Sequence, residues 1–509
     1  MNTNFKPLGL AAAVATATAG YAGVANAQSY AAASELGDLA IVPYYTTMEG
    51  YATGVNIVNT SSVTQVIKFR FRRATDSMDA LDCNVVLSPQ DMYPGFISKS
   101  GDDITWTSND NSCTAPEYNV GDNKFAMPDI YRENADTGYI EIISMGSPDS
   151  ESAPLALAAK HGADGVPASC DIVRDNFFAG GVSNTKRGVV DSANTVGPDL
   201  ADEDLALATT TYVASPDSLK VSFFIKSDET GTEFGDNAVH IAGFLDTPSI
   251  TNQQTGIFSG DLQGFDYPDL NGGAPTNPAS RGKFNALRTE LAAQELMNDW
   301  SANVAGDFSV DTDWVVTFPG QYVMLDLGEY IPRTINGAGL EAECLRTGVV
   351  PAADSDEVAD CDFRDIPVTA SITVYDREEQ GIVVEEGDLV VSPSPPIVIP
   401  ELTLDNEVNV IQWGSAPVLN APIAITGLDV PAGASFGWAS LVGTPAEGNT
   451  MLCDWTGAVA PADTYACMLP AESTDAAPTV GFVAWQRNFG ANPDANYGRI
   501  VEHSRVQSS

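Results

Sequence analysis

The most regular pattern in the chain is an alternation of hydrophobic and basic side chains from Val66 to Phe71 and into the residues that follow. The two alternating sets are Ile67, Phe69 and Phe71 on one side and Lys68, Arg70 and Arg72 on the other. A period of two is the spacing of a β-strand with one buried face, whereas a helix would spread both sets around its circumference. The pattern therefore predicts a strand.

Short apolar runs on either side of this strand predict an antiparallel meander. Strands are expected over Asp38–Tyr45, Val55–Val58 and Asp82–Leu87, with turn-forming Gly, Asn and Ser residues between them. Parallel neighbours would need crossovers of a dozen or more residues, and these connections are shorter. The apolar face of such a meander needs a second layer to cover it.

Similar strand patterns recur along most of the chain, separated by long polar loops over 146–218 and 247–280. The remaining predicted strands before residue 391 are Thr137–Met145, Leu219–Lys226, Ala238–Leu245, Asp313–Leu325 and Val368–Tyr375. One helix is expected near 284–300, because apolar residues there step by three and four. These residues are Phe284, Leu287, Leu291, Leu296 and Trp300.

A proline-rich segment, 392–400, holds four prolines in nine residues, which favours an extended linker. Short strands separated by turns follow it, and this spacing is typical of a sandwich. They are Glu407–Trp413, Ala421–Ile425, Phe436–Val442, Met451–Trp455 and Val480–Gln486. The sequence thus predicts an all-β protein of two β-sandwich-like (Ig-like) parts, 28–391 and 401–509.

The N-terminal 27 residues resemble a cleaved signal peptide. An apolar run follows Lys6 and ends at Ala25-Asn26-Ala27, an A-x-A cleavage signal. Removing Lys6 with this leader leaves 68 acidic against 23 basic side chains, a formal charge of −45. Such an excess disfavours nucleic acid and anionic membranes as partners. We therefore expect an extracellular or cell-surface protein, and no later apolar run is long enough to predict a transmembrane helix.

Seven cysteines in an exported chain are expected to form disulfides. Six fall into sequence-local pairs, each worth about 3 kcal/mol by the chain-entropy estimate. The predicted pairs are Cys83 with Cys113, Cys344 with Cys361, and Cys453 with Cys467. Cys170 is left over, although spacing alone does not determine which cysteine is the odd one.

One catalytic hypothesis rests on Gly433-Ala434-Ser435-Phe436-Gly437, which matches the G-x-S-x-G of a hydrolase nucleophile elbow. Asp454, Asp463 or Asp494 followed by His503 completes the chain order Ser, Asp, His. An elbow needs a helix after its serine, however, and the residues after Ser435 have a strand pattern. The favoured interpretation is a turn, with a secreted serine hydrolase using Ser435 and His503 as the alternative.

Two kinds of charged cluster are candidates for binding. Lys68, Arg70, Arg72 and Arg73 form either a surface ledge for acidic glycans or a neighbouring subunit, or internal ion pairs with the chain's own acids, and internal pairing is favoured. Acidic clusters supply the oxygen ligands that Ca²⁺ prefers. These clusters are Asp354, Asp356, Glu357, Asp360 and Asp362, and Asp266, Asp269 and Asn271. Neither has EF-hand spacing, so Ca²⁺ is a candidate ligand only, and no other cofactor is predicted.

Seven stretches, in order, resemble a family of exported, β-rich proteobacterial surface proteins. They are DLAIVPYYTTMEGYATGVNIVNTS, KFRFRRATDSMDALDCNVVLSPQDMYPGF, TGYIEIISMG, TDWVVTFP, YDREEQ, EVNVIQW and YGRIVEHSR. The family has no established activity, so the resemblance implies an envelope or extracellular setting and no catalytic residues. This chain departs from the family pattern in its acidic, cysteine-bearing insertions.

The sequence as a whole favours a non-catalytic exported protein, not an enzyme, that forms a surface layer, matrix or filament by self-association or adhesion. Open sheet edges present unpaired N–H and C=O groups, and this chain has few lysines to block them. Self-association is therefore the expected partnership, with extracellular glycans as a second class of partner and a glycan-binding module as a further alternative function.

Overall fold

The computed structural model describes the chain in segments. These are 30–31, 35–48, 50–75, 77, 79–115, 123–128, 131–175, 210–250, 268, 270, 286–287, 290–302, 308–320, 368–377, 397–431, 433–445, 452–453, 467–468 and 478–506. Strands dominate, in several antiparallel sheets, and this confirms the predicted all-β class. Two short helices, α1 (Pro154–Ala159) and α2 (Cys170–Asp175), lie in a region predicted to be loop.

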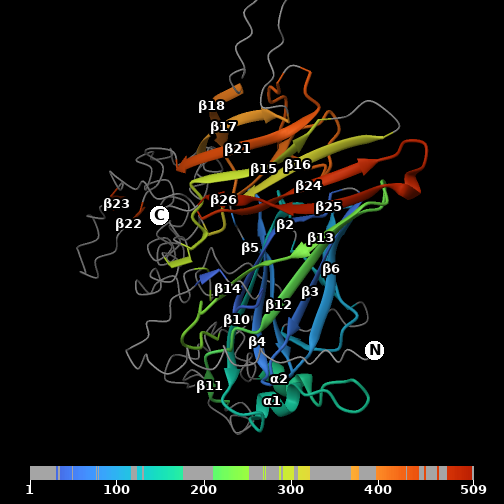
Figure 1. The fold of residues 1–509 in the computed structure, drawn as a ribbon. Coiled ribbons are helices and arrows are strands. Elements are labelled where there is room, and N and C mark those ends of the chain that lie inside the picture. Colours follow the sequence, from blue (N-terminus) through green and yellow to red (C-terminus); the bar gives the residue numbers. More distant parts are fainter. Residues whose placement is uncertain are drawn as a thin grey trace, which may run out of the picture.

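The first sandwich consists of two facing sheets (Figure 1). The eight-stranded sheet runs in the order β1 (Tyr30–Ala31), β14 (Val239–Ala242), β2 (Leu39–Thr46), β10 (Thr137–Pro148), β4 (Gln65–Arg73), β5 (Asp79–Leu87) and β8 (Cys113–Ala115), with β11 (Tyr212–Val213) paired to β10. The six-stranded sheet runs in the order β13 (Glu233–Asn237), β12 (Leu219–Ser227), β3 (Tyr51–Asn59), β6 (Met92–Ser100), β7 (Asp103–Thr107) and β9 (Lys124–Ala126).

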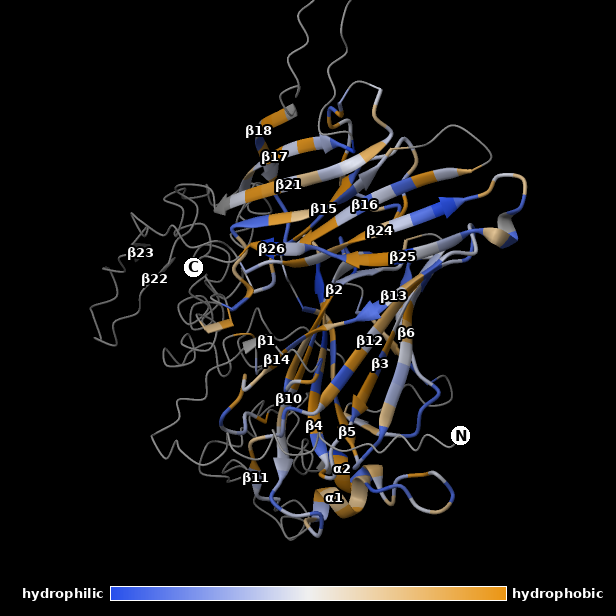
Figure 2. Ribbon diagram, in the orientation of Figure 1, coloured by the Kyte–Doolittle hydropathy of each residue, from blue (hydrophilic) through white to orange (hydrophobic). Residues whose placement is uncertain are grey.

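The hydrophobic half of the alternating strand β4 faces the interior of this sandwich. The ring of Phe69 packs edge-on against Trp106 of the opposite sheet, with centroids 4.7 Å apart. The expected meander is wrong in its pairing, because β3 belongs to the facing sheet and β10 lies between β2 and β4. Alternation predicts a strand and its buried face but does not choose its partner. Figure 2 shows the hydrophobic residues concentrated on these strands.

The second sandwich also has two facing sheets. Its outer five-stranded sheet runs in the order β18 (Ile397–Leu404), β17 (Val368–Asp376), β21 (Phe436–Pro445), β15 (Glu295–Ser301) and β26 (Ser504–Val506). Its inner five-stranded sheet runs in the order β20 (Ala424–Ile425), β19 (Val408–Gln412), β16 (Ser309–Thr317), β24 (Val480–Asn488) and β25 (Tyr497–Glu502). Trp300 of the outer sheet stacks on Trp413 beside the inner sheet at 5.6 Å, in the shared core. A separate pair, β22 (Leu452–Cys453) and β23 (Cys467–Met468), completes the described strands.

The second sandwich lies across one end of the first, so that its inner sheet is covered on both faces (Figure 1). Phe482 of β24 packs against Phe223 of β12 with ring centroids 5.8 Å apart. The Tyr51 hydroxyl donates to the Val418 carbonyl at 2.8 Å, across the same junction. One hydrophobic cluster thus includes residues of both sandwiches, and the two share a core.

Two predictions about the architecture are wrong. The helix expected near 284–300 includes helical residues Leu287 and Leu291 but gives way to strand β15, which pairs with β21 and β26. The expected linker at 392–400 overlaps β18, which pairs with β17. Strands on both sides of that segment therefore belong to the same sheets, and the sheets do not divide there. β18 is at the edge of its sheet, the position where a strand tolerates proline.

A membrane-spanning helix was not expected, and none of the helices in the described part of the chain is long and apolar enough to be one. The predicted leader, residues 1–27, lies outside the described residues.

Candidate functional site

The basic residues of β4 are buried and do not form a surface ledge. Lys68, Arg70 and Arg72 have no solvent-exposed surface, and Arg73 is 8% exposed. Lys68, Arg70 and Arg72 lie on the face of the eight-stranded sheet opposite to Phe69 and Phe71, because alternate residues of a strand point to opposite faces. The surface-binding hypothesis for these residues is therefore wrong, and internal pairing with acids is what the structure contains.

Arg70 and Arg72 form a closed ring of ion pairs with two carboxylates. Asp79 lies 3.0 Å from Arg70 Nε and 3.0 Å from Arg72 Nη1. Glu141 lies 2.8 Å from Arg72 Nε and 3.5 Å from Arg70 Nη1. The Tyr139 hydroxyl also donates to Glu141, at 3.3 Å. Two positive and two negative charges thus neutralise one another in a site without solvent.

The disulfide prediction is wrong for the first pair. Cys113 is bonded to Cys170, whereas Cys83 has a buried free thiol whose pKa burial raises to about 12. Cys83 and Cys113 lie in neighbouring strands, but Cys83 faces the sandwich interior and Cys113 faces the helices. Side chains on opposite faces of one sheet cannot bridge.

The other two predicted pairs stay predictions. Cys453 and Cys467 are directly opposite each other in the β22–β23 pair, the register that their pairing requires. Cys344 and Cys361 lie outside the described residues.

The nucleophile elbow is not formed, because strand β21 and not a helix follows Ser435. His503 is buried, and burial lowers its pKa to about 4. Its Nε2 lies 2.9 Å from the Val315 carbonyl and its Nδ1 lies 3.2 Å from the Asn298 amide nitrogen. Nε2–H therefore donates to the carbonyl and Nδ1 accepts from the amide, which leaves neither nitrogen available as a base for Ser435.

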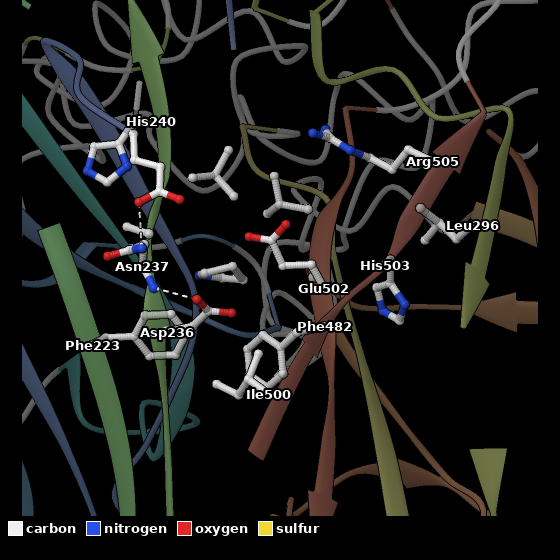
Figure 3. Close-up of a pocket in the computed structure, with 16 residues that line it drawn as sticks. Phe223, Asp236, Asn237, His240, Leu296, Phe482, Ile500, Glu502, His503 and Arg505 are labelled. Atoms are coloured by element: carbon white, nitrogen blue, oxygen red, sulfur yellow. Dashed lines mark hydrogen bonds between the residues drawn. The ribbon is translucent and has the colours of Figure 1, made fainter. Parts of the chain in front are cut away.

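A pocket at the junction of the two sandwiches gathers charged residues that are far apart in sequence (Figure 3). Its cavity is about 270 Å³ and is lined by both apolar and polar residues. The lining residues are Glu35, Pro43, Phe223, Asp236, Asn237, Ala238, Val239, His240, Leu296, Val480, Gly481, Phe482, Ile500, Glu502, His503 and Arg505. In Figure 3, Glu502 points from β25 toward the wall formed by Asp236 and Asn237 of β13.

The carboxylates of this pocket repel one another. Burial is the main cause that raises the pKa of Asp236, and the nearby charge of Glu35 raises it further. Burial also raises the pKa of Glu502, with smaller contributions from Asp236 and Glu35. Arg505 is the neighbouring cation, and its pKa is lowered chiefly by burial. The pocket is therefore a site of unbalanced negative charge between two rigid sheets.

The structure does not test the predicted calcium sites. The part of the chain that the structure describes contains no group of three or more Asp, Glu, His or Cys side chains close enough to hold a metal ion. The residues of both predicted calcium clusters, including Asp266, Asp269 and Asn271, are not among the described residues.

Sequence reasoning missed the pocket because its residues come from eight separate strands and the segments between them. Glu35 and Glu502 are at opposite ends of the chain, and neither stands in a motif with fixed spacing. His240 Nε2 accepts from the Val221 N–H at 2.8 Å, as a hydrogen-bonded packing residue does. Only the tertiary arrangement brings these groups together.

Comparison with protein-family models, with curated proteins and with solved structures gives no match for this chain. The resemblance to exported surface proteins therefore stays a prediction.

Proposed function

We propose that this chain is a non-catalytic exported surface protein that acts by adhesion, through the outward face of the outer five-stranded sheet. The observation that carries the proposal is a group of large apolar side chains on that face. They are Val398, Phe436, Trp438, Val442 and Val506, each between 37% and 54% exposed. Phe436 and Trp438 are two residues apart on β21 and therefore neighbours on this face, and exposed apolar side chains that gather on one face mark a candidate binding site.

The aromatic residues of this face are held in fixed positions. Tyr375 and Trp438 are directly opposite each other on β17 and β21, and their rings stack with centroids 4.0 Å apart at an interplanar angle of 5°. The Arg377 guanidinium lies over the Phe436 ring, 4.9 Å from its centroid. Rings fixed by neighbours lose little conformational entropy when a ligand binds.

The ligand class that suits this face is a glycan. The apolar C–H faces of pyranose rings stack on indole and phenol rings, and their hydroxyls need carboxylate or hydroxyl partners beside the ring. Asp299 is exposed and lies opposite Trp438 on the strand next to it, β15. An aromatic ring beside a free carboxylate therefore offers both contacts to one sugar.

Binding of the mature protein to a panel of neutral and acidic polysaccharides tests the proposal. We expect Trp438→Ala to weaken binding by at least about tenfold, as for a central aromatic anchor. Tyr497→Ala removes an aromatic side chain that is 43% exposed on β25, away from this face, and is the matched control. Absence of polysaccharide binding by the wild type, or equal loss in both variants, would contradict adhesion through this face.

Self-association is the second candidate, favoured by the position of β18. Among the described strands this one has a single neighbour, β17, and its Val398 is 54% exposed. A second copy could add a strand at that edge, and salt would screen the repulsion between acidic copies. Light scattering of Trp438→Ala and Tyr497→Ala across NaCl and CaCl₂ series distinguishes self-association from adhesion. A protein that stays monomeric at every salt concentration contradicts self-association.

A further inference from the structure

The pocket between the sandwiches contains a buried hydrogen-bond donor that the described residues do not satisfy. Arg505 Nη1 is buried and has no hydrogen-bond partner among them. His240 Nε2 accepts from the Val221 N–H at 2.8 Å, so its Nδ1 carries the hydrogen and faces the Ala238 carbonyl. A buried donor without an acceptor is costly and marks a position for a ligand acceptor.

The same pocket offers acceptors for a cationic group. Glu35 and Asp236 each accept one hydrogen bond from Asn237, at 2.8 Å, and retain further lone pairs. Glu502 approaches from the other sandwich (Figure 3). Three carboxylates against one guanidinium leave the pocket negative, and an ammonium group would remove the repulsion between them.

The size and the apolar residues of the pocket limit the ligand. A cavity of about 270 Å³ is slightly below the range of about 300–1,000 Å³ typical of drug-sized ligands. Its apolar lining residues include Phe223, Phe482, Ile500 and Leu296. A small ligand with a short aliphatic chain fits both conditions.

We propose that this pocket binds a small aliphatic amino acid as its zwitterion. The ammonium group pairs with Glu502 and Asp236, the carboxylate accepts from Arg505, and the aliphatic side chain packs on Phe223 and Phe482. This site is separate from the adhesive face, and both sandwiches contribute to it, so that a bound ligand also links them.

Isothermal titration of the full mature protein with three probes tests each contact. L-leucine carries all three groups, isopentylamine lacks the carboxylate, and 4-methylpentanoate lacks the ammonium group. We expect leucine to bind at least about tenfold more tightly than either of the others, the loss typical of one charge-assisted hydrogen bond. Equal binding of isopentylamine and leucine would overturn the role of Arg505, and no leucine binding would overturn the site.

Substitutions separate the site from general effects of charge. Arg505→Met and Glu502→Gln should each weaken leucine binding by about tenfold or more. Arg499→Met and Glu233→Gln change the same residue types at exposed positions outside the pocket and should leave binding unchanged. Thermal melting of each variant confirms folding, and because Glu502 is exposed, its variant keeps the test valid if Arg505→Met does not fold. Unchanged leucine binding in a folded Glu502→Gln variant would contradict the proposal.

Discussion

Arg70 and Arg72 have no contact with solvent, so each depends on Asp79 and Glu141 for charge compensation. Desolvating four charges costs more free energy than a single ion pair returns, and the closed ring with its extra hydrogen bonds offsets that cost. The Arg70 guanidinium gains a further acceptor in the Pro268 carbonyl, at 3.2 Å. The polar face of β4 is therefore a second, ionic core on the other side of the sheet.

Removing one member of this ring should be strongly destabilising. Glu141→Gln removes one of the two carboxylates of the ring from buried guanidinium groups, and we expect it to lower the free energy of unfolding by about 3–5 kcal/mol. The matched control is Arg132→Gln, which breaks an ion pair with Asp103, whose side chain is 64% exposed, and should cost at most about 1 kcal/mol. Urea denaturation of both variants measures the difference, and similar small losses would contradict a mutually dependent ring.

Residue-level patterns predicted strand β4, its apolar face and the internal pairing of its cations, but not which acids pair with them. Alternation shows that two faces differ, and a charged face normally indicates solvent. Here Glu141 comes from β10, about 70 residues away, and no local spacing links it to Arg70. The same limit explains the wrong disulfide prediction. Sequence separation favours pairing of Cys83 with Cys113, but the strand register places their side chains on opposite faces of the sheet.

At the level of elements, β15 shows how one spacing fits two structures. Leu296 and Trp300 are four residues apart, which places them on one face of a helix and also on one face of a strand. Leu287 and Leu291 are helical, and the chain becomes extended only where β21 and β26 provide partners. Hydrogen bonding to β21 and β26 makes this segment a strand and not a helix. Both partners are distant in sequence, so the residues around Trp300 do not indicate them.

The two tryptophans of this sheet allow its two faces to be compared. Trp300 is buried, stacks on Trp413, and donates from Nε1 to the Tyr375 carbonyl at 2.9 Å. Trp300→Ala should therefore cost about 3–5 kcal/mol of stability. Trp438→Ala, on the exposed face, should cost much less while reducing adhesion. Chemical denaturation followed by near-UV circular dichroism measures both, and equal costs would contradict the assignment of the two faces.

For the whole molecule, composition and strand spacing were sufficient to predict an all-β protein with sandwich-like packing. They did not predict the boundary between the two sandwiches, because β15, β16 and β17 precede the proline-rich segment and yet belong to the sheets of the second sandwich. Nor did they predict that the inner sheet packs against the first sandwich, with Phe482 and Val315 in its core. That shared core should make the two sandwiches unfold together.

Asp313 lies at this junction and couples stability to pH. Its Oδ2 accepts the N–H groups of Val418 and Leu419 at 2.8 Å each, and the Val418 carbonyl accepts from Tyr51 of the first sandwich. Burial raises the pKa of Asp313 to about 7, and burial raises the pKa of Asp38 to about 7 as well. Between about pH 4 and pH 7 the folded state keeps a proton at each group that the unfolded state has lost.

The sign of this linkage means that the contribution of Asp313 and Asp38 to stability is greatest below about pH 4 and falls as pH rises toward 7. Asp313→Asn retains an oxygen for both N–H groups but cannot ionise, so the decline over this window should be smaller by up to about 4 kcal/mol. Asp494→Asn makes the same charge change at an exposed position and is the matched control. Urea unfolding at four pH values between 4 and 7.5 measures the slopes. Equal slopes for wild type and Asp313→Asn would show that the junction carboxyl is ionised throughout, and that the pH dependence arises elsewhere.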